Sequence, residues 1–151
     1  HVEQGKALAK EYKIPDIVAA GIAEHHGDNI IQYFYLAAKE KYPDKEINPD
    51  DYRYKGPRPQ TREAVILMLA DSIEATSRAM ADASPEKLTA MVHTTIAARL
   101  AEGQFSDSDL TVKDLDRLEN AFLQSMVGAY HTRVKYPAAA LAAGMKKPEN
   151  I

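Results

Sequence analysis

The 151-residue sequence contains no cysteine and has no excess of basic residues. The absence of cysteine excludes disulfides and thiol catalysis, and it is compatible with a reducing cytosol. Lys and Arg number 19 against 22 Asp and Glu, so the formal net charge is −3 and the pI is about 6.0. Because DNA and RNA polymers are held by an overall basic surface, we expect neither as a partner. A phosphate ligand would need a local site.

The sequence also lacks a membrane-length apolar run and a visible signal peptide, so we expect this piece to be soluble. With 45% hydrophobic and 27% charged residues, its composition is that of one globular domain with a sizeable core. We find no convincing strand, internal repeat or second domain. We expect the domain to cover residues 1–137, followed by a peripheral, small-residue tail over 138–151.

Helical periodicity and punctuation predict an all-α fold of about six helices. Pro15 suits a first helical turn, Gly27 and Gly103 suit the residue after a helix, and Thr111 with Asp114 resembles a capping box. A proline-rich loop is expected over 44–60. The predicted helices cover approximately residues 1–12, 15–26, 29–42, 61–82, 84–102 and 111–135.

The helix predicted over 61–82 carries a carboxylate among apolar residues. Asp71 shares one stripe with Leu67, Glu74 and Arg78. The opposite face is apolar as well, with Ile66, Leu69, Ile73 and Met80. We therefore expect the helix to be enclosed on most sides and Asp71 to lie in a core, where an ionised carboxylate needs a metal ion or an arginine. Arg78 could be that arginine, or it could bind a phosphate through its fork of donors.

His25 and His26 are adjacent in the last turn of the second predicted helix. Neighbouring helical residues point about 100° apart, so the pair cannot bind one ion in the ordinary i, i+4 manner. They could serve two neighbouring ions, or one could bind an ion while the other contacts substrate. Alternatively, one caps the helix and the other is exposed. Asp71 and His1 on other helices favour a metal site. We interpret His93 and His131 as structural.

The loop run Arg53–Pro59 combines cations, an aromatic ring and a restricted backbone. Tyr54 could stack on a base while Lys55 and Arg58 bind phosphate. The alternative is a solvated loop whose positive charge offsets the acidic residues before it. A second aromatic group is interpreted as core and rim of the third helix rather than as a base-binding platform: Tyr33, Phe34 and Tyr35.

Six motifs occur along the chain in a fixed order and spacing: His1-Val2-x-x-Gly5, His25-His26-Gly27, Tyr33-Phe34-Tyr35, Arg53–Thr61, Ile66–Ala75 and His131–Pro137. Together they resemble the cytosolic HD domain of the seven-transmembrane HD family, the PgpH-type cyclic di-AMP phosphodiesterases. The match extends to Pro137 and implies an all-α, HD-domain-like helical bundle.

The resemblance implies a phosphodiesterase that hydrolyses cyclic di-AMP to pApA with two divalent ions, iron or manganese. The nucleophile would be water, with no side chain in that role. By motif, His1, His25, His26 and Asp71 would be metal ligands. The residues expected to bind the cyclic dinucleotide are Arg78, Lys55, Arg58 and Tyr54.

The family's first histidine and its His-Asp dyad do not occur in this sequence. We therefore expect them upstream of His1, together with further N-terminal helices of the domain and membrane-spanning helices. The chain would then belong to the cytoplasmic domain of a bacterial inner-membrane protein. A homodimer is left open.

Other functions fit some of the same residues. Ala-Asp-x-Ile-Glu with a downstream arginine also suits an HD-type nucleotide phosphohydrolase that cleaves a dinucleoside polyphosphate. A non-catalytic sensor module that binds nucleotide without cleaving it is a further alternative.

Overall fold

A computed structural model describes residues 1–131, with side chains described up to Gly128. Within this range the chain forms six α-helices and one short 3₁₀ helix, η1, and no strand, which confirms the predicted all-α fold. The helices are α1 (Val2–Glu11), α2 (Asp16–Glu24), α3 (Gln32–Lys41), η1 (Pro49–Tyr52), α4 (Arg62–Ala79), α5 (Pro85–Ala101) and α6 (Val112–His131).

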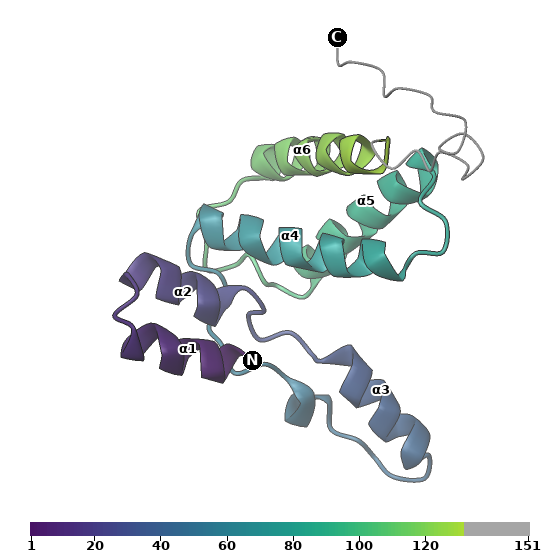
Figure 1. The fold of residues 1–151 in the computed structure, drawn as a ribbon. Coiled ribbons are helices and arrows are strands. Elements are labelled where there is room, and N and C mark those ends of the chain that lie inside the picture. The colour runs from purple at the N-terminus through teal and green to yellow at the C-terminus, as the bar shows by residue number, and fades with distance from the viewer. Residues whose placement is uncertain (132–151) are drawn as a thin grey trace, which may run out of the picture.

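The hydrophobic core lies between α4, α5 and α6, which pack together in Figure 1. On α4, Val65, Met68, Leu69 and Ile73 follow the spacing of one helix face, and each is at most 1% exposed. Burial of one such side chain contributes about 1.5–3 kcal/mol. The other helices complete the core with Leu88, Met91, Val92 and Ile96 from α5 and Leu115, Leu118, Phe122, Leu123 and Met126 from α6.

The helices α1 and α2 form an antiparallel hairpin that contacts α4 through α2 (Figure 1). The tight joint between them includes Lys13, which has a positive φ of 52°. Because the hairpin is antiparallel, the first residue of α1 lies beside the last turn of α2. This arrangement places His1 next to His25 and His26.

The prediction that α4 is enclosed on most sides is wrong for the described part of the chain. Ile66 is 41% exposed and Leu67 is 46% exposed. The Asp71 side chain is also 45% exposed, so this carboxylate does not lie in a core. The reason is that α5 and α6 cover only the face that carries Val65 to Ile73, while α2 contacts part of the remainder.

The third helix is shorter than predicted and projects away from the helical core (Figure 1). It begins at Gln32 because Ile30 forms an antiparallel bridge with Arg53 instead of a first helical turn. Its contacts are with η1, and Tyr33 and Phe34 are 78% and 58% exposed. The prediction that these rings belong to a core is therefore wrong.

Several helix ends follow the predicted signals. Gly103 directly follows the C-cap Glu102 of α5 with φ of +72°, in the left-handed region that glycine tolerates. Gly27 also has a positive φ of +54°, but α2 ends earlier than predicted, at Glu24 with His25 as its C-cap. Thr111 and Asp114 form the reciprocal capping bonds at the start of α6. The predicted end of α6 near residue 135, the side chain of His131 and the tail at 138–151 lie outside the described residues. Among the described helices, none combines the length and apolarity needed to cross a bilayer.

Substituting Gly27 with alanine should lower the free energy of unfolding by about 3 kcal/mol, combining a left-handed non-glycine residue with overpacking. An added Cβ would overlap Oε1 of the buried Gln104 and lie 3.0 Å from Cε of Met68. Denaturant unfolding measures the change. Gly128→Ala in α6 is the control: its Cβ would meet no described atom within 4 Å, so it should be neutral or slightly stabilising. Equal stability of the two variants would contradict the packing argument.

Candidate metal centre

Three histidine side chains converge where the open end of the α1–α2 hairpin meets α4. Nε2 of His1 lies 3.3 Å from Nε2 of His25 and 2.9 Å from Nε2 of His26. One ligand atom from each residue lies within 4.8 Å of the others. The close approach of the two helices depends on Gly5, since a Cβ there would come 2.7 Å from Cγ2 of Ile22.

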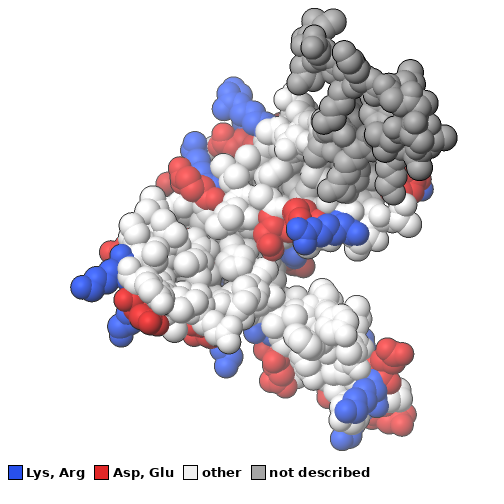
Figure 2. Space-filling view, in the orientation of Figure 1, with Lys and Arg blue, Asp and Glu red and all other residues white. Residues whose placement is uncertain are grey.

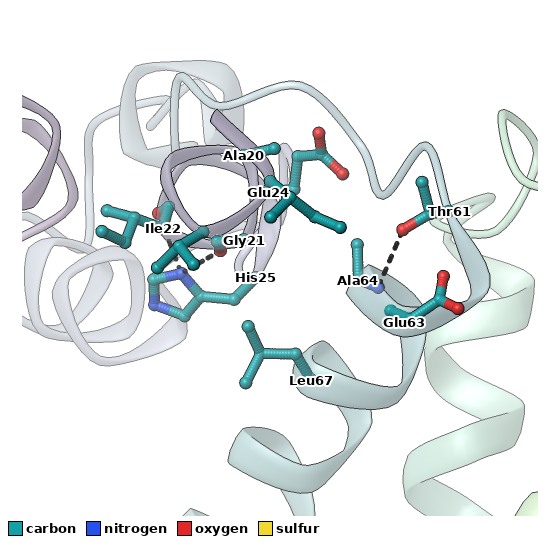
Figure 3. Close-up of a pocket in the computed structure, with 11 residues that line it drawn as sticks. Ala20, Gly21, Ile22, Glu24, His25, Thr61, Glu63, Ala64 and Leu67 are labelled. Atoms are coloured by element: carbon teal, nitrogen blue, oxygen red, sulfur yellow. Dashed lines mark hydrogen bonds between the residues drawn. The ribbon is translucent and has the colours of Figure 1, made fainter. Parts of the chain in front are cut away.

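The two adjacent histidines can face the same space because α2 ends at Glu24. His25 is the C-cap, and its ring centroid lies 4.1 Å from that of His26. The expectation of divergent side chains, which assumed a continuing helix, therefore does not describe this pair. Nδ1 of His25 lies 3.2 Å and 3.0 Å from the carbonyl oxygens of Gly21 and Ile22 (Figure 3). Since carbonyl oxygens only accept, Nδ1 is the donor in these contacts, and Nε2 is the ring nitrogen that faces His1.

His26 is held between a carboxylate and an aromatic ring. Its Nδ1 lies 3.7 Å from Oδ2 of Asp71, and its ring stacks on that of Tyr54 with centroids 4.2 Å apart and planes 19° from parallel. Burial lowers the pKa of His26, the charge of His25 lowers it further, and Asp71 opposes the change. The lowered pKa favours the neutral imidazole of His26, the form that can offer a lone pair to a metal ion.

Main-chain pairing of the proline-rich loop with residues 29–31 fixes Tyr54 over His26. Tyr54 N–H donates to the Asn29 carbonyl at 2.9 Å, and Ile31 N–H donates to the Tyr52 carbonyl at 2.7 Å. Farther along the loop, a Cβ on Gly56 would overlap the carbonyl oxygen of Ala23, so the backbone passes directly against α2. Burial, followed by the charge of Asp71, raises the pKa of the Tyr54 phenol. This loop is thus an ordered wall of the site.

The spacing of the imidazole nitrogens fits a shared metal ion. Nitrogen ligands about 2.1 Å from one ion, at the angles of tetrahedral or octahedral coordination, are about 3.0–3.4 Å apart. The separations from Nε2 of His1 are close to that range, at 3.3 Å to Nε2 of His25 and 2.9 Å to Nε2 of His26, and all three ligand atoms lie within 4.8 Å of one another. The carbonyl partners of His25 are also of the kind that orient metal-binding imidazoles.

The remaining predicted ligand and three predicted substrate-binding residues do not all lie at the histidine cluster. Asp71 contacts His26 but is not in the group of ligand atoms formed by the three histidines. Lys55 is exposed beside Tyr54. Arg58 lies 3.4 Å from Oδ2 of Asp28, and Arg78 forms an ion pair with Glu74. These two arginines are therefore engaged by carboxylates, and the structure does not bring them to the histidines.

Arg99 is a neighbour of the site that sequence reasoning missed. It belongs to the last turn of α5, and its Nε lies 3.4 Å from Oγ of Ser72, the residue after Asp71. Burial and the charge of His25 lower the pKa of His26 most, and Asp71 raises it. The positive charge of Arg99 adds a smaller lowering effect. The only sequence signal was a basic residue near a helix end, which is common and uninformative.

Beside His25, a groove of about 420 Å³ runs between α2 and α4. Figure 3 shows Leu67 at its α4 side and His25 at the end of α2. The charged residues that line it are Glu24 and Glu63, and neither would attract a phosphate. The groove is otherwise mostly apolar, so it suits hydrophobic contact better than an anionic ligand.

The all-helical fold and the three convergent histidines agree with a match to a known protein family. The chain belongs to the HD domain family, whose sequence pattern matches residues 1–76. It is 37% identical over 139 residues to a Bacillus subtilis protein named cyclic-di-AMP phosphodiesterase PgpH, covering 92% of this chain. It is 34% identical over 137 residues to the Listeria monocytogenes protein of the same name, covering 91% of this chain. The chain spans 19% of the length of each of these relatives.

A solved structure supports the same assignment. The HD domain of Listeria monocytogenes PgpH, determined in complex with cyclic-di-AMP, superposes with a TM-score of 0.81 at 33% sequence identity. The similarity covers 86% of this chain and 60% of that one. The predicted resemblance to the PgpH type is therefore confirmed.

Proposed function

We propose that the protein carrying this chain is a metal-dependent phosphodiesterase that hydrolyses cyclic di-AMP to pApA. The observation that carries the proposal is the convergence of three imidazole nitrogens, from His1, His25 and His26, within 4.8 Å of one another. The names of its relatives and the ligand of the similar HD domain support this substrate.

The chain's own residues would hold the metal and orient the substrate. His1, His25, His26 and Asp71 are the proposed ligands in this chain for a centre of two iron or manganese ions. Such ions supply Lewis-acid polarisation of a phosphoryl oxygen and lower the pKa of a water nucleophile. The carbonyl oxygens of Gly21 and Ile22 hold the His25 ring so that Nε2 is directed toward His1.

The ordered loop would bind the nucleotide beside this centre. Tyr54 presents an aromatic ring next to the histidines, and Lys55 is an exposed cation adjacent to it. Stacking on Tyr54 and charge from Lys55 suit a base with its phosphate. Arg58 and Arg78 could contribute only by exchanging their present carboxylate partners.

We also propose that the domain is the cytoplasmic part of a bacterial inner-membrane protein, anchored by helices elsewhere in the full chain. A homodimer of such proteins is compatible with this arrangement. On the face shown in Figure 2, Lys and Arg alternate with Asp and Glu around the edges and form no extended basic surface. That distribution agrees with a small anionic substrate rather than a nucleic-acid polymer.

Comparing substrates with the intact, metal-loaded protein tests the proposal. We expect turnover of cyclic di-AMP to pApA, with kcat/KM at least about tenfold above that for cyclic di-GMP or a diadenosine polyphosphate. Preferential cleavage of the polyphosphate would identify the other HD-type phosphohydrolase. Tight binding of cyclic di-AMP without any product would instead identify a sensor module.

A further inference from the structure

The segment that follows the two adjacent histidines has left the helix and relies on contacts from other parts of the chain. Helix α2 ends at Glu24, with His25 as its C-cap. Beyond that point, Gly27 N–H still donates to the Glu24 carbonyl at 2.8 Å. The directions of the His25 and His26 rings therefore depend on how Gly27 and Asp28 are fixed.

Gln104, in the connection between α5 and α6, lies directly against this segment. It is 1% exposed, and its Nε2 donates to Oδ1 of Asp28 at 2.6 Å, although the two residues are 76 positions apart. Its Oε1 would overlap a Cβ added to Gly27, and within the described part of the chain this oxygen has no hydrogen-bond partner. A methionine would fill the same space without an unpaired acceptor. The bond to Asp28 is therefore the feature that explains a glutamine here.

Asp28 is the point where two other segments meet the histidine turn. Its Oδ2 accepts from Nε of Arg58 at 3.4 Å, and its main-chain carbonyl accepts from Nη1 of Arg53 at 3.1 Å. Nη1 of Arg58 also donates to the carbonyl of Gly103 at 3.4 Å. The proline-rich loop and the α5–α6 connection are thus joined at a carboxylate two positions after His26.

The proline-rich loop fixes the other flank of the histidines as well. Glu24 is only 7% exposed, and its Oε2 accepts from the main-chain N–H of Gln60 at 2.9 Å. The pair His25 and His26 therefore lies between two carboxylates, Glu24 before it and Asp28 after it, and each is held by a group from a distant segment.

We propose that Gln104, acting through Asp28, is a positioning residue for the metal centre. It fixes the turn at Gly27 so that the imidazoles of His25 and His26 keep the directions that a shared ion requires. From the proposed function, the inference needs only that the histidines bind a divalent metal. Groups that orient metal ligands typically change metal affinity about tenfold to a hundredfold when they are removed. Because Gln104 acts through the backbone, we expect the lower end of that range.

Calorimetric titration of the intact, metal-free protein with Mn²⁺ tests the proposal, with Tm of the metal-free protein measured alongside. Gln104→Met keeps the length of the side chain but cannot donate, so Kd should rise about tenfold. Asp28→Asn keeps an oxygen that can accept from Gln104, so Kd should stay within about threefold. Val92→Ala is the control: it removes a fully buried core contact on α5 and should lower Tm by several degrees, with Kd unchanged.

A double-mutant cycle determines whether Gln104 acts through Asp28. The Asp28 side chain is 39% exposed, so Asp28→Ala should fold, and its Kd should also rise about tenfold. Adding Gln104→Met to Asp28→Ala should raise Kd no further, whereas independent effects would multiply.

Four results would overturn the positioning role: an unchanged Kd in Gln104→Met or Asp28→Ala, multiplied effects in the double variant, an equal rise in Kd in Val92→Ala, or no Mn²⁺ binding by the unaltered protein. The expected pattern of Mn²⁺ affinities, without turnover of cyclic di-AMP by the unaltered protein, would support the positioning role and reject only the proposed hydrolysis.

Discussion

Asp71→Ala in the intact protein should reduce turnover of cyclic di-AMP by about a hundredfold or more, the loss seen when a metal ligand or its orienting partner is removed. The reason is position: Oδ2 of Asp71 lies 3.7 Å from Nδ1 of His26. The fold should be retained, because the Asp71 side chain is 45% exposed and no core contact is lost. Steady-state kinetics measures the activity, and thermal unfolding measures the stability.

The matched control is Glu74→Ala. Glu74 lies one turn beyond Asp71 on α4, its side chain is 51% exposed, and it pairs with Arg78 at the surface. Exposed pairs of this kind contribute at most about 1 kcal/mol, so the variant should remain stable and active. Similar activities for the two variants would show that Asp71 is an ordinary surface carboxylate. A large fall in Tm for Asp71→Ala alone would assign it a structural role instead.

The exposure of Asp71 also shows what periodicity can and cannot determine. The sequence correctly predicts the helix and places Asp71 on the stripe with Leu67. It cannot determine whether another element covers that stripe, and in the described chain both residues are about half exposed. Apolar residues around the whole helix suggested enclosure, but only one face meets α5 and α6.

The histidine cluster illustrates a second limit. Local signals predicted the end of α2 at Gly27, and the residue types indicated metal binding. The meeting of His1 with His26 depends on the antiparallel α1–α2 hairpin, which brings together residues 25 positions apart. No periodicity encodes that contact, and the position of Tyr54 likewise depends on a short main-chain pairing across the loop. The sequence identified His1 as a candidate ligand on another helix, but it could not predict which of the two adjacent histidines His1 would contact.

Removing divalent metal should abolish hydrolysis of cyclic di-AMP by the intact protein, and adding back Mn²⁺ or Fe²⁺ should restore it. The expected loss is at least about a thousandfold, because the attacking water would no longer have its pKa lowered. Dialysis against a chelator, followed by kinetics and elemental analysis, measures activity and bound metal together. Undiminished activity of metal-free protein would reject the proposed mechanism.

Stability gives a readout that does not depend on turnover. A metal that binds only the folded protein adds about 2.7 kcal/mol at a free concentration of one hundred times Kd, so Tm should rise on its addition. His26→Ala should remove most of that rise, because one of three convergent Nε2 atoms is lost. His93→Ala is the matched control: His93 lies on α5, 3.1 Å from Glu119, so the metal-dependent rise should be unchanged. An equal rise in the unaltered protein and in His26→Ala would place the metal somewhere other than the histidine cluster.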